Sequence, residues 1–457
     1  MAFDLLAWLA TASWQQLVIA SAATRVVIIC WMWFSYRVIG GGECYDSCDT
    51  FYNERYNATK YLNHWDSVHF RHVATSGYSH EHVHAFFPGV PALHMFLEDH
   101  LGLHASSVNV LAVVAYCVAL LALRGLTRIV ARRYARLALP PALLALPFVT
   151  ATAAHDRFVG ATVFLFLASP TNVFTVVSYT ESFFACACLV GLYFTALDPV
   201  LSKPPMRRGD TIEVKRRQRC NDWYPFLGAW LCFVAASLFR SNGFLLACIV
   251  MVPPVITALS SPLQIMTHHR RWLLGAFLRG LMCVVVLLPY LLANFVGWDR
   301  YCRDQLEIVY GMLRGDRCKI TGFYPMIQSL YWNVGWFRQW TVTNSPNFLI
   351  AAPPILLGAQ SLLRHSSRLR NFIQFSPDAI VFNVQMWHLV GLWYLAVTTI
   401  HVQVVNRLVF ACPAVYWLGA WQLVSEPRGW ITRVLVAYCV VCSVIGPLMF
   451  ANHMNWT

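Results

Sequence analysis

The sequence is poor in charged residues. Asp, Glu, Lys and Arg make up 12% of its 457 residues, whereas hydrophobic residues make up 58%. Soluble domains contain about one quarter charged residues, so this composition excludes an ordinary soluble protein and indicates a membrane protein. The net charge of +13 would suggest nucleic-acid binding in a soluble chain, but Lys and Arg retained in cytoplasmic loops explain it here. We therefore expect the lipid bilayer, and no nucleic acid, as a partner.

We also expect neither internal repeats nor a cleavable signal peptide. The sequence shows no internal repeat and no low-complexity tract, which disfavours a transporter built from inverted repeats. No small-residue cleavage site follows the first apolar stretch, near residues 17–39. We expect that stretch to be a signal anchor.

Apolar stretches long enough to span a membrane recur along the chain. We predict one all-α polytopic domain over residues 1–457 with about eleven spans, near 17–39, 105–127, 157–172, 180–197, 223–239, 243–260, 273–296, 346–363, 379–400, 406–424 and 431–451. Basic clusters follow the second, fourth, sixth and eighth spans, so the positive-inside rule makes that side cytosolic. The loops 40–104 and 297–345 are then luminal. Segment 137–156 contains three prolines, and we expect it to be cytosolic or interfacial.

The predicted luminal loop 40–104 has further features of a luminal segment. It is rich in acidic residues and carries a glycosylation sequon at Asn57, which is usable only on the luminal side. A chance triplet is the alternative. Luminal cysteines can form disulfides, but the sequence does not determine the pairing of Cys44, Cys48, Cys302 and Cys318.

One stretch of this loop matches a zinc-protease motif. Residues 80–84, "HEHVH", fit the pattern H-E-x-x-H, which needs both histidines on one helical face and a third ligand. Pro88 follows within about one turn and would end such a helix. With 16 His in the chain, a chance match is unsurprising. A membrane zinc protease using His80 and His84 is therefore the disfavoured alternative, and we predict no metal site.

The same loop also gathers carboxylates and imidazoles. Asp66 follows His64 and Trp65, and Glu81 follows fifteen residues later. Carboxylates with nearby His can deprotonate a sugar hydroxyl and then stabilise a leaving phosphate. The structural alternative is that Asp66 only caps the helix expected at "SVHFRHVA", because Asp is a good N-cap residue.

Six blocks of sequence, in order along the chain, resemble a known family. They are "HWDSVHF" with "GYSHEHVHAFFPGVP", "SPTNVFTVVSYTESFFA" (169–185), "FRSNG" (239–243), "YWNVGWFRQW" with "PNFLIAAPP" (331–354), "HVQVVNR" (401–407) and the terminal "WT". Together they resemble the GPI mannosyltransferase II (PIG-V) family. The cytosolic loops and segment 137–156 do not resemble the family closely.

The resemblance implies a GT-C glycosyltransferase of the endoplasmic reticulum membrane, with its active site at the luminal ends of the spans. It implies dolichyl-phosphate-mannose as donor substrate and mannosyl-glucosaminyl-phosphatidylinositol as acceptor, joined through an α-1,6 linkage, and no cofactor. The absence of a D-x-D motif on a nucleotide-binding fold disfavours a sugar-nucleotide donor. Another dolichyl-phosphate-mannose-dependent transferase is the alternative, and a small accessory membrane subunit is left open as a partner.

The expected chemistry needs one general base, because a β-linked donor and an α-product require inversion. Asp66 is the expected base. Glu81 is expected as a helper carboxylate or acceptor ligand, and a pair with a neighbouring His is its structural alternative.

The leaving phosphate needs cations or hydrogen-bond donors. Arg240, Arg407 and His401 are expected there, because ionisable groups at membrane depth are costly and favour function. Snorkelling to the interface is the alternative for the arginines. Glu181 is expected to bind the sugar or Arg240. The other substrate-binding candidates are His64, Trp65, His82 and Asn242, for which a solvated side chain or an interface anchor is the alternative.

Overall fold

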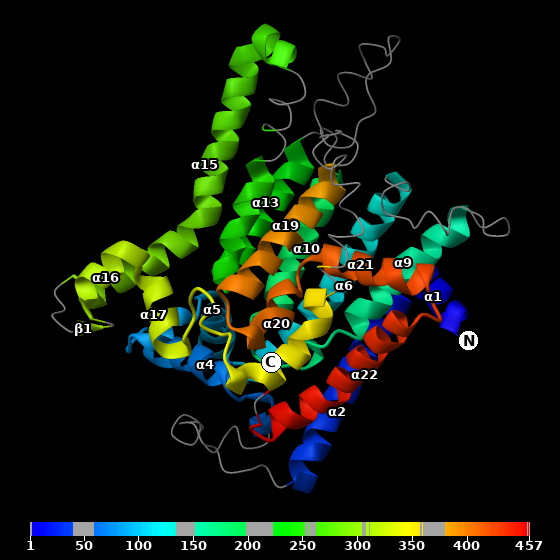
Figure 1. The fold of residues 1–457 in the computed structure, drawn as a ribbon, viewed down its shortest axis with the longest axis horizontal. Helices are drawn as coiled ribbons and strands as arrows, with labels where there is room; N and C mark the ends of the chain where they lie inside the picture. Colours follow the sequence, from blue (N-terminus) through cyan, green and yellow to red (C-terminus); the bar gives the residue numbers. More distant parts are fainter. Residues whose placement is uncertain are drawn as a thin grey trace.

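The computed structural model describes residues 2–39, 59–133, 151–197, 223–251, 262–303, 311–356 and 380–454, with residues 255, 308, 309, 359 and 456. This part of the chain is mostly helical, with a single two-stranded sheet (Figure 1). The predicted sequon at Asn57, the cysteines Cys44 and Cys48, and residues 137–150 lie outside the described residues.

In the first half of the described chain every regular element is a helix. Its elements are α1 (Ala2–Thr11), α2 (Trp14–Ile39), α4 (Asp66–Ser76), η2 (His82–Ala85), α5 (Gly89–Met95), η3 (Phe96–His100), α6 (Ser107–Arg133), α9 (Ala151–Leu167), η4 (Asn172–Thr175), α10 (Glu181–Leu197) and α13 (Trp223–Phe239).

The second half adds the small sheet and the remaining helices. Its elements are η5 (Ser241–Leu245), α15 (Pro262–Tyr301), β1 (Ile308–Val309), β2 (Met312–Leu313), α16 (Arg314–Thr321), α17 (Phe323–Trp332), η6 (Val342–Asn344), α19 (Ile380–Thr398), η8 (Val402–Val404), α20 (Val405–Val409), α21 (Pro413–Ser425) and α22 (Trp430–Ala451).

Several of these helices have the length and composition of a membrane span. Among the described residues, Trp14–Ile39, Ser107–Arg133, Leu273–Tyr301 and Trp430–Ala451 are long and apolar enough, and Glu181–Leu197, Tyr224–Phe239 and Ser241–Met251 are shorter apolar helices. The expected spans 180–197 and 223–239 coincide with α10 and α13 almost residue for residue. The count of eleven spans stays a prediction.

Two expected spans are broken in the structure. The stretch 157–172 is not one helix, since α9 ends at Leu167 and η4 follows. Pro170 lies in the break, and a proline disfavours helical geometry in the residue before it. The stretch 406–424 consists of two helices, Val402–Val409 and Pro413–Ser425, bent by 87°. Pro413 starts the second of them, because a proline can begin a helix but cannot continue one.

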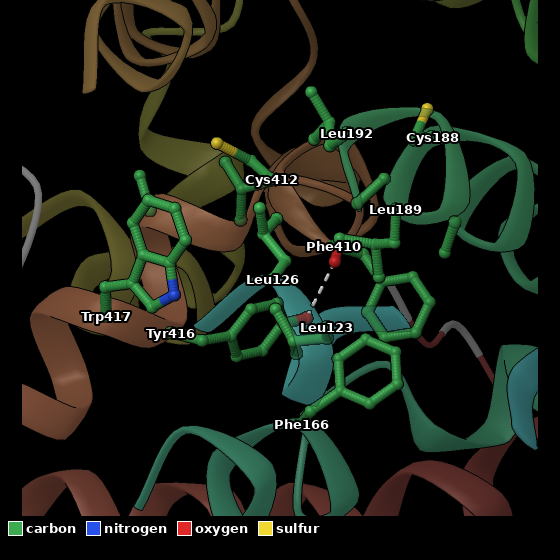
Figure 2. Close-up of a cluster of buried hydrophobic side chains, with 14 of the residues drawn as sticks. Leu123, Leu126, Phe166, Cys188, Leu189, Leu192, Phe410, Cys412, Tyr416 and Trp417 are labelled. Atoms are coloured by element: carbon green, nitrogen blue, oxygen red, sulfur yellow. Dashed lines mark hydrogen bonds between the residues drawn. The ribbon is translucent and has the colours of Figure 1, made fainter. Parts of the chain in front are cut away.

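Buried apolar side chains, several of them aromatic, form the core of the helical bundle, and Figure 2 shows part of this core. The rings of Tyr116, Phe166 and Phe410 stack in a row, with centroids 4.9 and 5.2 Å apart. The polar tips of buried aromatic residues also have partners. The Tyr416 hydroxyl donates to the Phe410 carbonyl at 2.8 Å, and Trp417 Nε1 donates to Thr127 at 2.9 Å. This core fixes α6, α9, α20 and α21 relative to one another.

Two arginines in the second half of α6 bind backbone carbonyls at or near the ends of two other helices. Arg124 Nη1 donates to the Ala12 carbonyl just after α1 (2.6 Å), and Arg133 Nη1 donates to the Ala196 carbonyl near the end of α10 (2.7 Å). Cations stabilise the carbonyl ends of helices in this way. The first residue of α10, Glu181, therefore lies at the opposite end of the bundle.

The two predicted luminal loops pack on each other at that opposite end. Helix α15 contains Pro289 and bends away from the bundle toward α16 (Figure 1). A disulfide joins Cys302 to Cys318, which settles one pairing that the sequence left open. The strand pair β1–β2 connects α15 to α16, with Val309 opposite Met312. Helix α17 then contacts η2 of the first loop.

Candidate active site

Asp66 begins helix α4 directly after an unusual turn. Trp65 has φ 55° and ψ −121°, the angles of the first central residue of a type II′ turn, a position that favours glycine. The Ser67 amide closes the turn by donating to the His64 carbonyl at 3.2 Å. The N-cap position of α4 belongs to Trp65, so the alternative in which Asp66 only caps this helix is wrong.

The Asp66 carboxylate is one end of an alternating row of charges. Arg407 Nη2 lies 2.8 Å from Asp66 Oδ2, and Arg407 Nε donates to Glu181 Oε1 at 2.5 Å. Arg240 Nη1 donates to the same Glu181 oxygen at 2.6 Å. The order is Asp66, Arg407, Glu181, Arg240, and we refer to these four residues as the charge chain.

Burial differs along the charge chain. The Glu181 side chain is 0% exposed, whereas the Asp66 side chain is 31% exposed. A buried carboxylate is costly unless charged donors satisfy it, and two guanidinium groups do so for Glu181. Asp66, by contrast, keeps a surface that a substrate can reach.

Aromatic rings flank both arginines of the charge chain. The guanidinium carbon of Arg407 lies 4.7 Å from the ring centre of Phe174 and 5.0 Å from that of Tyr179. The corresponding carbon of Arg240 lies 5.7 Å from the ring centre of Phe184. Such cation–π contacts are favourable, most of all where water is excluded. Both guanidinium groups turn inward to Glu181, so snorkelling does not describe their position.

A tight reversal of the chain places Arg240 at the end of α13. The Gly243 amide donates to the Arg240 carbonyl at 3.0 Å. A Cβ atom on Gly243 would lie 2.5 Å from Ser237 Cα, so only glycine permits this close approach. The predicted substrate ligand Asn242 lies half-buried in the same reversal, within η5.

Glu81 lies in a different environment from Asp66. Arg314 Nη1 is 3.1 Å from Glu81 Oε2, and the Tyr331 hydroxyl donates to the same oxygen at 3.0 Å. In the described part of the chain, the ion pairs and hydrogen bonds of Glu81 lead to the second loop and not to the charge chain. The expected alternative, a pair with a neighbouring His, is wrong, because the partner is an arginine from α16.

The H-E-x-x-H stretch does not form the helix of a zinc protease. Residues His82–Ala85 form one 3-10 turn, and Glu81 is paired with Arg314. His80 Nδ1 lies 2.8 Å from Ser79 Oγ, whereas His84 is buried beside Tyr301. Burial is the main reason why the pKa of His84 falls to about 4. No group of three or more His, Cys, Asp or Glu side chains that could hold a metal ion occurs in the described ranges.

The other predicted histidines have separate surroundings. His64 is fully buried, with its ring 3.6 Å from that of His453, and burial lowers the pKa of His64 to about 3. His82 is half-buried, with its ring 5.6 Å from that of Tyr331. His401 accepts a hydrogen bond from the Gln403 amide at 3.3 Å and so caps η8. The hydrogen bond of the His401 side chain is thus local, although η8 leads directly into α20, the helix that carries Arg407.

A family model described as mannosyltransferase (PIG-V) matches residues 42–457 of this chain. The chain belongs to this family. The match spans the charge chain and both predicted luminal loops, and it confirms the predicted family and the prediction of a glycosyltransferase. Nothing supports the alternative of a zinc protease.

Curated relatives of this PIG-V family chain extend over most of its length. GPI mannosyltransferase 2 of Yarrowia lipolytica is 28% identical, over 90% of this chain and 91% of the relative. GPI mannosyltransferase 2 of Gibberella zeae is 26% identical, over 86% and 85%. GPI alpha-1,6-mannosyltransferase 2 of Cricetulus griseus is 26% identical, over 87% of both chains.

A solved structure also matches, over part of its own length. It is the archaeal oligosaccharyltransferase AglB from Archaeoglobus fulgidus in complex with an inhibitory peptide and a dolichol-phosphate. The TM-score is 0.44 and the identity 13%, and the match covers 98% of this chain and 56% of AglB.

The structure of this PIG-V family chain adds residues that the sequence did not single out. Phe174 and Tyr179 flank Arg407, and Arg314 holds Glu81. Phe174 and Tyr179 lie within the family-like block 169–185, beside Glu181, so that block is the signal that could have found them. Arg314 lies outside every such block, and nothing in its sequence surroundings marks it.

Proposed function

We propose that this PIG-V family member transfers the second mannose of the GPI precursor, in an α-1,6 linkage. The donor is dolichyl-phosphate-mannose and the acceptor is mannosyl-glucosaminyl-phosphatidylinositol. The charge chain carries this proposal, because it joins an accessible carboxylate to two guanidinium groups. Such a transfer needs a base for the acceptor hydroxyl and cationic donors for the leaving phosphate. The names of the relatives support the choice of substrates.

In the proposed step, Asp66 takes the proton of the 6-hydroxyl of the first mannose. The oxygen of that hydroxyl forms a bond to C1 of the donor mannose. The bond from C1 to the phosphate oxygen breaks, and its electron pair leaves with dolichyl phosphate. One displacement of this kind inverts the β-linkage of the donor into the α-linkage of the product.

The order of the charge chain fits this displacement. An in-line reaction places the base and the leaving group on opposite sides of C1. Asp66 and Arg240 stand at the two ends of the charge chain, with Glu181 holding both arginines between them. We therefore assign the leaving phosphate mainly to Arg240. Since the arginines take up its charge, the scheme uses no metal ion or cofactor.

An apolar groove supports the assignment of a lipid-linked donor. The groove has a volume of about 370 Å³ and lies between α13 and α15, with Phe86 and Phe87 of the first loop contributing to its wall. Leu238 also lines the groove, and Arg240 follows Leu238 by two residues. A polyprenyl chain in this groove would therefore run along the last turn of α13, the helix end that Arg240 follows.

We also propose a GT-C arrangement with eleven spans in the endoplasmic reticulum membrane and the charge chain at the luminal face. Glu181 lies at the end of α10 opposite to Arg133. Arginines near span ends are retained on the cytosolic side, so the opposite end faces the lumen.

The test is an assay of the full chain in detergent with labelled dolichyl-phosphate-mannose and the mannosylated acceptor. We expect α-1,6 transfer by the wild type and none by Asp66→Asn, which cannot take the proton. Asp316→Asn is the matched control, since Asp316 is exposed and paired only with Lys319 among its described contacts. Transfer that prefers an acceptor without the first mannose would favour another dolichyl-phosphate-mannose-dependent enzyme. Turnover by Asp66→Asn at the wild-type rate would refute the role of Asp66.

A further inference from the structure

Tyr179 contacts both partners of the Asp66–Arg407 ion pair. Its hydroxyl accepts a hydrogen bond from the Asp66 amide at 3.1 Å. The same hydroxyl donates to the His64 carbonyl at 3.3 Å. The ring of Tyr179 lies under the Arg407 guanidinium, 5.0 Å from its carbon. Tyr179 thus contacts both the backbone of Asp66 and the guanidinium group of Arg407.

The two hydrogen bonds of Tyr179 enclose a strained residue. The His64 carbonyl precedes Trp65 and the Asp66 amide follows it, and Trp65 has φ 55°. A bulky residue at positive φ is strained and persists only where its surroundings hold it in place. The Tyr179 hydroxyl forms hydrogen bonds with the backbone on both sides of Trp65 and so holds this residue in place.

The position of Tyr179 is itself fixed. Its side chain is 1% exposed, and its ring packs against Phe174 and Phe450, with centroids 5.1 and 5.7 Å away. Tyr179 also precedes Glu181 by two residues, so the backbone that carries it leads into the centre of the charge chain. Because Tyr179 is held rigidly, it can fix the positions of Asp66 and Arg407 together.

We propose that Tyr179 is a positioning residue that holds the turn before Asp66 and thereby aims the carboxylate at the acceptor hydroxyl. The inference rests on the proposed function of Asp66 as general base. Tyr179 itself takes no proton and touches no reacting atom in this scheme. Its hydroxyl orients the first turn of α4, and its ring supports the guanidinium group of Arg407.

The test is Tyr179→Phe, which keeps the ring under Arg407 and removes the hydroxyl. We expect about a tenfold loss of kcat, since one or two hydrogen bonds that orient the base are lost. The KM for the donor should change less than twofold, because the ring and both arginines remain. Rates are taken per folded molecule, counted by fluorescence-detected gel filtration, and the thermal midpoint is measured alongside.

Tyr416→Phe is the matched control, because Tyr416 is another buried tyrosine whose hydroxyl donates to a backbone carbonyl, that of Phe410 (Figure 2). It should lower the thermal midpoint and leave kcat per folded molecule unchanged. Phe174→Leu removes a ring that contacts both Arg407 and Tyr179 but keeps the Tyr179 hydroxyl and its two hydrogen bonds, so it should cost less kcat than Tyr179→Phe. Wild-type kcat in Tyr179→Phe, or an equal loss of kcat in Phe174→Leu, would overturn the proposal. Either result leaves the proposed reaction standing as long as the wild type transfers mannose and Asp66→Asn does not.

Discussion

Replacing Arg240 by lysine keeps the positive charge and removes the planar fork of donors. In the structure one nitrogen of that fork, Nη1, is already engaged by Glu181 at 2.6 Å. The other guanidinium nitrogens can then donate to a phosphate, because the fork presents several donors at once. A lysine has one nitrogen for both tasks, so Arg240→Lys has to weaken either the contact to Glu181 or the contact to phosphate.

The size of the effect follows from the contact that is lost. A hydrogen bond to a charged group contributes about 1.5–3 kcal/mol, which corresponds to roughly a ten- to hundredfold change in rate. Negative charge on the phosphate grows as the bond to C1 breaks, so the contact strengthens in the transition state. We therefore expect most of the loss in kcat and a smaller change in the KM for dolichyl-phosphate-mannose.

The assay is the transfer of labelled mannose at varied donor concentration, at saturating acceptor. Arg279→Lys is the control, because Arg279, like Arg240, is a half-buried arginine beside an aromatic ring, with its guanidinium carbon 3.9 Å from the ring centre of Phe226. It lies away from the charge chain and should leave kcat unchanged. Unchanged kcat in Arg240→Lys would refute the reasoning and make Arg407 the leading phosphate ligand.

Two further predictions concern the loops. The wild type should contain much less than one zinc ion per chain by elemental analysis, and the double variant His80→Ala/His84→Ala should contain the same amount, because no described group of side chains forms a metal site. Zinc near one per chain, lost in the double variant, would revive the protease alternative. Arg314→Met should destabilise the protein by about 3–5 kcal/mol, as it leaves Glu81 buried and without its cation, while kcat per folded molecule is kept. A lower kcat at an unchanged thermal midpoint would instead show that Glu81 takes part in the reaction.

Composition and local pattern determined the class of this protein and many of its helices. The helix α13 covers residues 223–239 as expected, because a continuous apolar run between polar segments has no better conformation in a membrane than a helix. The end of this helix follows the expected boundary between the spans 223–239 and 243–260, although the close approach that Gly243 permits there became visible only in the structure. The breaks at Pro170 and Pro413 were present in the sequence too. The expected spans 157–172 and 406–424 ran through both prolines, and the missing proline amide, which hydropathy does not register, decided where the helices end.

Contacts between distant residues were decided by the tertiary structure alone. Asp66 and Arg407 are 341 positions apart, and Glu81 and Tyr331 are 250 positions apart. A carboxylate in a loop could pair with any of many arginines in the chain, and the sequence does not show which of them will lie next to it. Packing of α10, α13 and α20 brings Glu181, Arg240 and Arg407 together, so that both arginines pair with the buried Glu181 carboxylate. Contacts between the two predicted luminal loops pair Glu81 with Arg314. The fold also places the Tyr179 hydroxyl between backbone groups on both sides of Trp65, because only a folded chain fixes the distances on which hydrogen bonds depend.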